Sequence, residues 1–373
     1  MKIAIVCYPT HGGSGVVASE LALGLAERGH EIHIVSYSTP FRLREFSQNV
    51  FIHEVEVASY PLFKYPPYAL GLATTLVDIY EEHKLDVIHA HYAVPHAASA
   101  FLAKKILGCQ NLKIMTTLHG TDITLVGADK SFQRVVKFSI EESDGVTSVS
   151  NFLRKRTIDE FNISKDIRVI YNFVDTTRCS EQTKECARAK YAPNGEKILM
   201  HASNFRPVKR VSDVVRIFAK VRDAIPAKLI LVGEGPERLF VQQLVKEMKL
   251  SEDVWFLGQQ DYIEHLLSCA DLFVLPTEQE SFGLVALEAH SCGVPVVGAA
   301  TGGLPEVVAD GETGFLLPVG EIAGMSQKAL ELLTNAHLNA LFSKTARARA
   351  VACFEKQKII PEYEAFYQEI LNR

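Results

Sequence analysis

The sequence predicts an α/β protein with two doubly wound, Rossmann-like domains in series. Apolar runs of strand length alternate with amphipathic helical segments along the whole chain. The strand-like runs are apolar at consecutive positions, which is typical of parallel strands that helices cover on both faces. At 373 residues the chain is also too long for one ordinary hydrophobic core.

The first half carries this alternation from the N-terminus to about residue 172. We expect strands at 3–9, 31–37, 51–57, 86–92, 113–120, 145–150 and 167–172, and helices at 16–29, 72–84 and 97–107. Ligands of doubly wound sheets bind beyond the carboxyl ends of the strands. Functional residues are therefore expected where a strand gives way to the next helix.

The second half starts the same alternation again. We expect strands at 197–203, 227–235, 253–259, 271–277 and 295–300, and helices at 211–225, 237–249, 262–270 and 284–293. The boundary near 171–177 gives an N-terminal domain, 1–172, and a C-terminal domain, 173–354. A last helix at about 355–373 is a candidate to pack back onto the N-terminal domain.

Composition argues against several functional classes. The net charge is −5 and the pI about 6.2, so no nucleic-acid or anionic-membrane surface is indicated. No apolar run approaches the roughly 20 residues that span a bilayer, and the first run stops at Pro9, which favours a strand over a secretory signal. The seven cysteines are scattered without a CxxC pair, so we expect no disulfide framework, no zinc site and a cytoplasmic location.

A glycine-rich turn, Thr10–Gly15, follows the first expected strand. It leads into a helix, whose free backbone N–H groups favour an anion. The turn fits a dinucleotide fingerprint, but the second strand ends at Val35–Ser38 without the acid that would bind a ribose. An NAD-dependent oxidoreductase is therefore disfavoured, and contact with an anion or a sugar is favoured over a plain tight turn.

Two histidines, His89 and His91, alternate on one strand just before Tyr92 and so face the same way. They could form a metal pair, but no nearby cysteine or carboxylate completes such a site. A polar pocket lining and a purely structural role are equally weighted alternatives.

The next strand ends in a polar cluster, Thr116–Asp122. Thr121 or Asp122 can cap the following helix. A functional interpretation places His119 at the carboxyl edge of the strand, facing an interdomain cleft, and both interpretations can hold for different residues.

Three cations, Arg206, Lys209 and Arg210, follow the first strand of the second half. A solvated charge run is the usual explanation. This turn, however, occupies the place that glycines hold in the first domain, where Arg and Lys would face a diphosphate. Gly233 begins a Gly-Glu-Gly-Pro turn of the same kind after the next strand.

Two glutamates, Glu280 and Glu288, stand in an otherwise apolar stretch, with seven residues between them. A position near a helix start explains Glu280 as a partner of the helix dipole. It does not explain Glu288, which lies in the helix body, where a buried carboxylate needs hydrogen-bond donors. Sugar hydroxyls are suitable donors, so the pair favours sugar binding.

In combination these motifs resemble glycosyltransferase family 4, whose members are retaining enzymes with the GT-B fold. The segments CYPTHGGSGVV, PFRL, FKYPPY, HAHYAVPHA, TTLHGTDIT, VSN and SNFRPVKRV are similar to the members that join GlcNAc to L-malate, the first step of bacillithiol biosynthesis. The resemblance implies two Rossmann-like domains facing a deep interdomain cleft, UDP-GlcNAc as donor, L-malate as acceptor and a homo-oligomer.

The resemblance also implies donor-binding roles in the second domain. Glu288 would hold the uridine ribose and Glu280 the 3-hydroxyl of GlcNAc. Lys209 and Arg206 would neutralise the diphosphate, although in many family members the arginine stands where this chain has Asn204. The remaining implied donor contacts are Gly233 and the backbone N–H groups around Phe282, Gly283 and Leu284.

Implied roles in the first domain concern the acceptor and the reacting sugar. Gly13 and Ser14 would face the β-phosphate and the acceptor, and His119 the 6-hydroxyl of the sugar. The residues implied near malate are Tyr92, Thr116 and Asn151. Arg154, Lys155 and Arg42 are open candidates for binding its carboxylates.

The implied mechanism is front-face attack, in which the departing phosphate helps to deprotonate malate and the enzyme supplies electrostatic stabilisation. The chain has no Asp-x-Asp, which fits a reaction without a metal or other cofactor. Alternatives are another small or lipid-linked acceptor, a UDP-GlcNAc 2-epimerase, or a non-catalytic nucleotide-sugar-binding module. The one basic–apolar stretch near the acceptor side, 41–46, is short for a lipid surface.

Overall fold

A computed structural model describes residues 1–10, 12–43, 47–57, 64–124, 127, 129–179 and 184–373. His11 and residues 44–46, singled out in the sequence, lie outside these ranges. The chain forms two compact units: unit 1 comprises Met1–Asn172 with Gln357–Arg373, and unit 2 comprises Phe173–Lys356. The boundary predicted after residue 172 lies at the same position.

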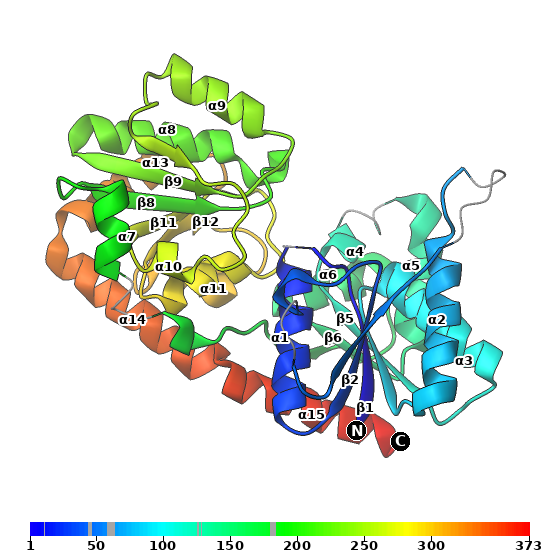
Figure 1. The fold of residues 1–373 in the computed structure, drawn as a ribbon. Helices are drawn as coiled ribbons and strands as arrows, with labels where there is room; N and C mark the ends of the chain where they lie inside the picture. Colours follow the sequence, from blue (N-terminus) through cyan, green and yellow to red (C-terminus); the bar gives the residue numbers. More distant parts are fainter. Residues whose placement is uncertain (11, 44–46, 58–63, 125–126, 128, 180–183) are drawn as a thin grey trace. The chain divides into compact units, whose positions relative to one another are not determined.

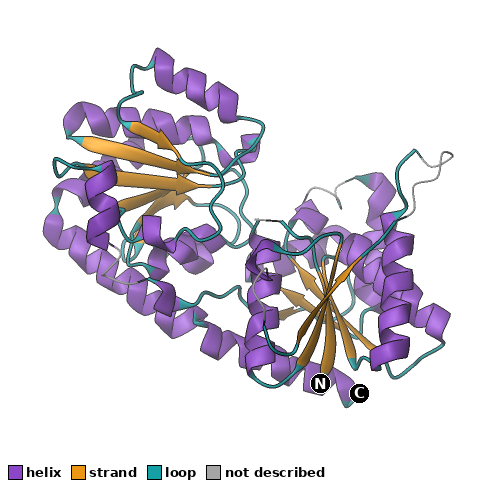
Figure 2. Cartoon of the chain, in the orientation of Figure 1, coloured by secondary structure: helices purple, strands orange, loops and turns teal. Residues whose placement is uncertain are grey.

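Unit 1 is a seven-stranded parallel sheet with the order β3-β2-β1-β4-β5-β6-β7. Its strands are β1 (Lys2–Val6), β2 (Glu31–Ser36), β3 (Val50–Glu54), β4 (Val87–His91), β5 (Lys113–Leu118), β6 (Gly145–Ser148) and β7 (Arg168–Val169). Its helices are α1 (Gly13–Glu27), α2 (Tyr68–His83), α3 (Ala98–Leu107), α4 (Thr121–Thr124), α5 (Lys130–Glu142) and α6 (Asn151–Phe161), with short turns η1 (Phe41–Leu43) and η2 (Ala93–Ala97). Helices cover both faces of the sheet (Figures 1 and 2).

Unit 2 repeats the architecture with a six-stranded parallel sheet of order β10-β9-β8-β11-β12-β13. Its strands are β8 (Lys197–Ala202), β9 (Ala227–Val232), β10 (Val254–Phe256), β11 (Leu272–Leu275), β12 (Val296–Ala299) and β13 (Gly314–Leu317). Its helices are α7 (Lys184–Tyr191), α8 (Val211–Ala224), α9 (Arg238–Glu247), α10 (Glu264–Leu267), α11 (Leu284–Ser291), α12 (Leu304–Val307), α13 (Ile322–Thr334) and α14 (Ala336–Phe354), with turns η3 (Thr176–Arg178) and η5 (Pro207–Lys209). The prediction of two doubly wound parallel sheets is confirmed.

The last helix, α15 (Lys356–Leu371), packs on unit 1. Gly24 of α1 is tight against it, since a Cβ there would lie 2.1 Å from Cδ1 of Ile360. His89 of β4 is fully buried beside the same helix, with Nδ1 2.7 Å from Oη of Tyr367 and Nε2 2.7 Å from Oγ1 of Thr117. Both ring nitrogens are thus engaged, which favours the structural interpretation of this histidine.

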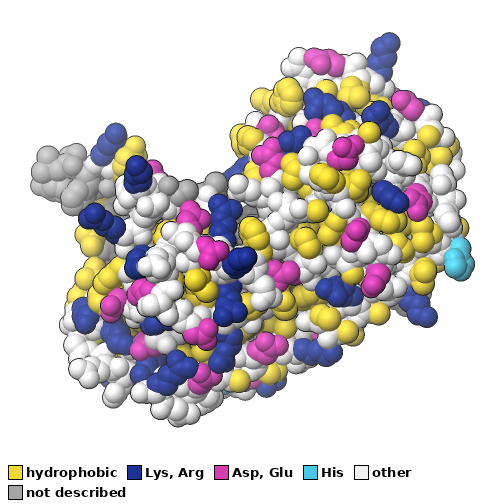
Figure 3. All heavy atoms as spheres, turned by 180° about the vertical axis from the view of Figure 1, so that it is seen from behind, with side chains coloured by type: hydrophobic (Ala, Val, Ile, Leu, Met, Phe, Trp, Pro, Cys, Tyr) yellow, Lys and Arg dark blue, Asp and Glu magenta, His cyan; other side chains and the backbone are white. Residues whose placement is uncertain are grey.

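Charge is distributed without strong segregation on the face shown in Figure 3, where acidic and basic side chains are interspersed. Among the described helices, none is long and apolar enough to cross a bilayer. The cytoplasmic location and homo-oligomeric state stay predictions.

One expectation from the sequence is wrong. Cys179 and Cys292 form a disulfide within unit 2, although 113 positions separate them. Their pairing depends on the fold, which brings the end of η3 against the end of α11, and no local spacing announces it. Cys7, Cys109, Cys269 and Cys353 are not disulfide-bonded.

We predict that Tyr367→Phe lowers the free energy of unfolding by about 1–3 kcal/mol, because it leaves a buried nitrogen of His89 without its partner. The matched control is Tyr65→Phe, at a side chain that is 74% exposed, and it is expected to change stability by less than about 0.5 kcal/mol. Urea unfolding of the three proteins is the measurement. Equal effects of the two substitutions would contradict the role assigned to the Tyr367 hydroxyl.

Candidate active site

The strand order of unit 1 reverses between β1 and β4, which pair directly. Such a switch point leaves a crevice beyond the carboxyl ends of the two strands, where doubly wound sheets bind ligands. Two predicted residues meet there, since Tyr92 after β4 donates a 2.6 Å hydrogen bond to Oγ of Ser14 in the first turn of α1. Burial raises the pKa of Tyr92 to about 12, so its hydroxyl keeps its proton at neutral pH. The backbone of Tyr92 has a φ of 96°, a strained value of the kind that clusters at functional sites.

The glycine turn beside this pair is closely packed. A Cβ on Gly15 would lie 2.3 Å from the carbonyl oxygen of Thr10, so only glycine allows α1 to start this close to the end of β1. Gly13, the first residue of α1, is exposed. The first N–H groups of a helix have no partner earlier in the helix and can donate to a ligand. Here this applies to the start of α1 before Gly15, whose own N–H donates to the carbonyl oxygen of Gly12 at 3.1 Å.

His119 follows β5 and joins the same group. Its Nε2 is 2.8 Å from Nδ1 of His91, and its ring lies 5.2 Å from that of Tyr92. Burial, together with the charge of His96, lowers the pKa of His119 to about 3, and burial likewise lowers the pKa of His91 well below its usual value. Both rings are therefore neutral at pH 7 and can serve as hydrogen-bonding groups but not as cations. Among the described residues, Nε2 of His91 has no hydrogen-bond partner.

Asp122 is a residue whose role in the site the sequence did not reveal. Its buried carboxylate accepts hydrogen bonds from the backbone N–H of Ala93 at 3.1 Å and of Gly120 at 3.0 Å. These bonds tie the turn after β4 to the turn after β5, and so hold Tyr92 and His119 in place. The polar cluster made Asp122 a candidate helix cap, but only the fold shows the second turn that it holds.

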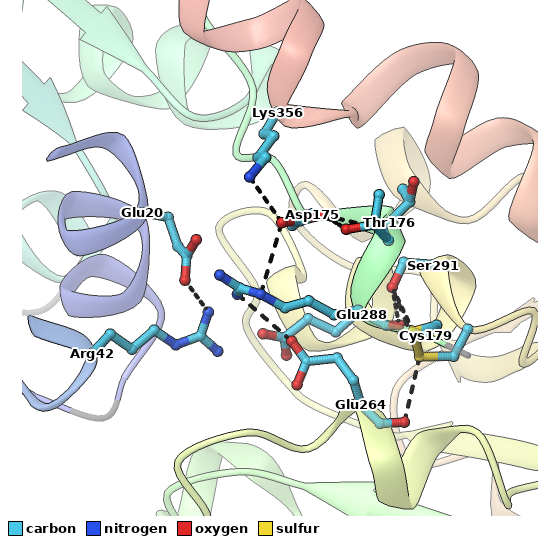
Figure 4. Close-up of polar contacts among 12 residues, drawn as sticks. Glu20, Arg42, Asp175, Thr176, Cys179, Glu264, Glu288, Ser291 and Lys356 are labelled. Atoms are coloured by element: carbon cyan, nitrogen blue, oxygen red, sulfur yellow. Dashed lines mark hydrogen bonds and ion pairs between the residues drawn. A yellow bond between two sulfur atoms is a disulfide. The ribbon is translucent and has the colours of Figure 1, made fainter. Parts of the chain in front are cut away.

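Two further residues predicted near the acceptor bond within unit 1. Thr116 is fully buried and its hydroxyl is 2.8 Å from that of Ser143, and its contact with the acceptor stays a prediction. Arg42 forms a 2.6 Å ion pair with Glu20 of α1, largely buried within unit 1 (Figure 4).

Two candidates lie on α6, the helix that follows β6 and is capped by Ser150. Asn151 is exposed in the first turn and donates a 2.9 Å hydrogen bond to Oη of Tyr171. Arg154, one turn later, is 3.7 Å from a carboxylate oxygen of Asp166. The acceptor-binding roles of both residues stay predictions.

Unit 2 has its own switch point, between β8 and β11. Nζ of Lys209, after β8, donates a 2.7 Å hydrogen bond to Oε2 of Glu280, after β11. The two side chains are 21% and 14% exposed, which makes this a shielded ion pair. An ammonium group has three donors, so Lys209 can hold Glu280 and still donate to a phosphate oxygen. The structure thus brings together two residues that the sequence predicted for the leaving group and the sugar.

The other two cations of this turn have different surroundings. Arg210 bonds to Asp213 in α8 and, at 2.6 Å, to Glu278, and the bond to Glu278 holds the turn after β8 against the turn after β11. Arg206 is exposed at the start of η5. Its role at a diphosphate stays a prediction, while Arg210 is a positioning residue.

Glycines allow the turns of unit 2 to approach one another. Gly233 has a φ of 117°, and a Cβ there would lie 1.9 Å from the carbonyl oxygen of Ser203, in the turn that leads to Lys209. Gly302, after β12, is in a similar position, since its Cβ would lie 1.8 Å from the carbonyl oxygen of Glu280. Gly233 therefore shapes the lysine turn, and its contact with a donor stays a prediction. The role of Gly302 was missed, although the Thr-Gly-Gly after a strand-like run was a signal.

Helix α11 carries the remaining donor-binding candidates. Gly283 caps it with a φ of 98°, and Phe282 and Leu284 beside it are buried. Their backbone N–H groups lie at the start of the helix, where an anion is favoured. Glu288 is 9% exposed one helical turn further on, and Ser291 donates a 2.7 Å hydrogen bond to its carbonyl oxygen (Figure 4). A carboxylate buried to this degree in a helix body fits the predicted role with hydroxyl donors.

Comparison with known proteins places this chain in a family. Residues 11–178 match the family model described as Glycosyltransferase Family 4, and residues 183–349 match that described as Glycosyl transferases group 1. The chain is 46% identical over its full length to N-acetyl-alpha-D-glucosaminyl L-malate synthase from Bacillus anthracis, covering 98% of that protein. The chain belongs to glycosyltransferase family 4. In this family 4 enzyme, the hydrogen-bonded pairs Tyr92–Ser14 and Lys209–Glu280 lie at the switch points of the two domains.

Solved structures confirm the fold of this glycosyltransferase. Anabaena HepE in complex with UDP-glucose superposes with a TM-score of 0.83 at 22% identity, covering 99% of this chain and 100% of that one. Sucrose-phosphate synthase from Thermosynechococcus elongatus gives a TM-score of 0.83 at 21% identity over 100% of this chain and 99% of that one. The two Rossmann-like domains are those of a GT-B glycosyltransferase.

We predict a pH dependence of stability from Asp122, whose pKa burial raises to about 6. The folded protein holds this proton more tightly than the unfolded chain. Relative to Asp122→Asn, the wild-type protein is therefore expected to lose stability as the pH rises from about 4 to about 6, by up to roughly 3 kcal/mol, and to show no further change above. Urea unfolding of both proteins at pH 4, 5, 6 and 7 measures this difference, and a constant difference would contradict it.

Proposed function

We propose that this enzyme transfers GlcNAc from UDP-GlcNAc to the hydroxyl of L-malate, with retention of the anomeric configuration. The observation that carries the proposal is the 46% identity to the Bacillus anthracis malate synthase over both domains. A relative that shared only the donor chemistry would not need to be similar along the whole first domain. The similarity therefore supports the acceptor as well as the donor.

Unit 2 supplies the donor chemistry in this proposal. Glu288 binds the ribose hydroxyls, and the start of α11 offers backbone N–H groups to the diphosphate. Lys209 and Arg206 stabilise the negative charge that develops on the leaving phosphate. Glu280 orients the ammonium group of Lys209 through their 2.7 Å bond and accepts a hydrogen bond from the sugar.

Unit 1 supplies the groups that face the acceptor. The Ser14 hydroxyl, fixed by Tyr92, and the N–H groups at the start of α1 are donors for anionic oxygens. His119 is neutral at pH 7 because its pKa is about 3, so it offers a hydrogen bond to a sugar hydroxyl without adding charge. Asn151 and Arg154 are further candidates for contact with the malate carboxylates.

The reaction breaks the bond between C1 of GlcNAc and the β-phosphate oxygen and forms a bond from C1 to the malate hydroxyl oxygen. The hydroxyl proton passes to the departing phosphate, so UDP leaves with the electron pair of the broken bond. The role of the protein is electrostatic, because cations and N–H groups are already oriented where negative charge develops. Two cations in the turn after β8 support a proposal that no metal ion is required.

The test is a mass-spectrometric product assay on EDTA-treated protein, with UDP-GlcNAc alone and then with L-malate. We expect a GlcNAc–malate product and UDP release only when malate is present. UDP release without that product would overturn the acceptor. Conversion of the sugar without an acceptor would indicate an epimerase, and recovery of activity only with added metal would overturn metal independence.

We predict that Lys209→Ala lowers kcat by about 10²–10³-fold, because it removes a preorganised charge from the leaving group. Lys220→Ala on α8, an exposed lysine of the same unit, is the control and should keep normal turnover. Steady-state kinetics with circular dichroism as a folding check provide the comparison. Near-normal turnover of a folded Lys209→Ala protein would contradict the role of this lysine.

A further inference from the structure

A cluster of metal-binding side chains lies in unit 1, apart from the candidate active site. Glu31 and His33 stand two positions apart on β2 and share one face of the sheet. His83, the last residue of α2, reaches the same place. One carboxylate oxygen and one nitrogen from each histidine lie within 4.8 Å of one another.

We propose that Glu31, His33 and His83 bind a divalent transition-metal ion, with Zn²⁺ as the expected ion. Two imidazoles and one carboxylate are a zinc ligand set, and zinc in such sites keeps a fourth position for water. Imidazole favours zinc and its neighbours over calcium and magnesium, which prefer oxygen ligands. A tetrahedral zinc ion holds each ligand atom at about 2.0–2.2 Å. The three donor atoms, which lie within 4.8 Å of one another, therefore approach one another when the ion binds.

A fourth residue, His53 on β3, orients the central ligand. Nδ1 of His33 is 2.9 Å from Nε2 of His53, and Nε2 of His33 is 3.1 Å from Oε1 of Glu31. When the Nδ1–H of His33 donates a hydrogen bond to Nε2 of His53, Nε2 of His33 carries the lone pair, which faces Glu31 and the ion. Metal-binding histidines commonly donate their second N–H in this way.

The surroundings shield the central ligand from solvent, because His33 is fully buried. The ring of Phe51 stacks on His33 with centroids 5.2 Å apart and forms an apolar wall.

Two charged groups flank the cluster: the Lys2 ammonium competes with the ion for Glu31, and the Glu82 carboxylate adds negative charge beside His83. Nζ of Lys2 is 3.4 Å from Oε1 of Glu31 with a side chain that is 43% exposed, and Oε1 of Glu82 is 3.7 Å from Nε2 of His83. Glu31 is the first residue of β2, whereas the candidate active site lies beyond the carboxyl ends of the strands. The ion thus joins the end of α2 to the start of β2 and takes no part in the transfer reaction.

The test is isothermal titration of untagged, EDTA-stripped protein with Zn²⁺ at pH 7.5. We expect one ion per chain in the wild type, and an affinity lowered at least about 10–100-fold in His83→Gln and in Glu31→Gln. Both substituted side chains are partly exposed, and circular dichroism checks that the variants fold. His337→Gln, an exposed histidine of unit 2, is the control and should bind as the wild type does.

Titration with Co²⁺ separates this site from the free thiols of the chain. We expect absorption bands of nitrogen and oxygen ligation that disappear in His83→Gln, without a thiolate-to-cobalt charge-transfer band. Absence of stoichiometric binding in the wild type would overturn the proposal. Unchanged affinity in both ligand variants, or a thiolate band, would overturn it as well.

Discussion

Each unit depends on one topological constraint, the reversal of strand order in a parallel sheet. At that reversal the connections on the two sides run apart, so the carboxyl ends of two adjacent strands border a space that no crossing helix fills. In unit 1 these strands are β1 and β4, and in unit 2 they are β8 and β11. The side chains that bond across each reversal are Tyr92 with Ser14 and Lys209 with Glu280, and the proposed mechanism depends on them.

Much of the fold was readable from the sequence, because burial on both faces leaves a strong signal in parallel strands. Continuous apolar runs located the central strands of both sheets. The signal fails where burial is partial: α5 buries only Val136, Ser139 and Ile140, and α6 only Leu153, Thr157 and Phe161, so their apolar stripes are too narrow to stand out. β3 was still predicted, as a strand at 51–57, although this edge strand exposes Phe51 and Ile52.

The sequence singled out candidate residues where the chemistry of one residue conflicts with its local surroundings, as for Glu288 in an apolar helix. The site was not predictable where a role comes from a contact between distant segments. Asp122 ties two turns together, and Arg210 links turns that are 68 positions apart.

The path of the chain through the two units has a consequence for the order in which they are made. Unit 2 is inserted into unit 1, and its ends are tied together: Val174 bridges to Glu355, and Asp175 bonds to Lys356 at 2.8 Å (Figure 4). During synthesis, all residues of unit 2 leave the ribosome before residues 357–373, which complete unit 1. Domains usually fold as units from the N-terminus onward. Here the first domain to begin is the last to be completed, and until α15 arrives the surface around Gly24 and His89 stays uncovered.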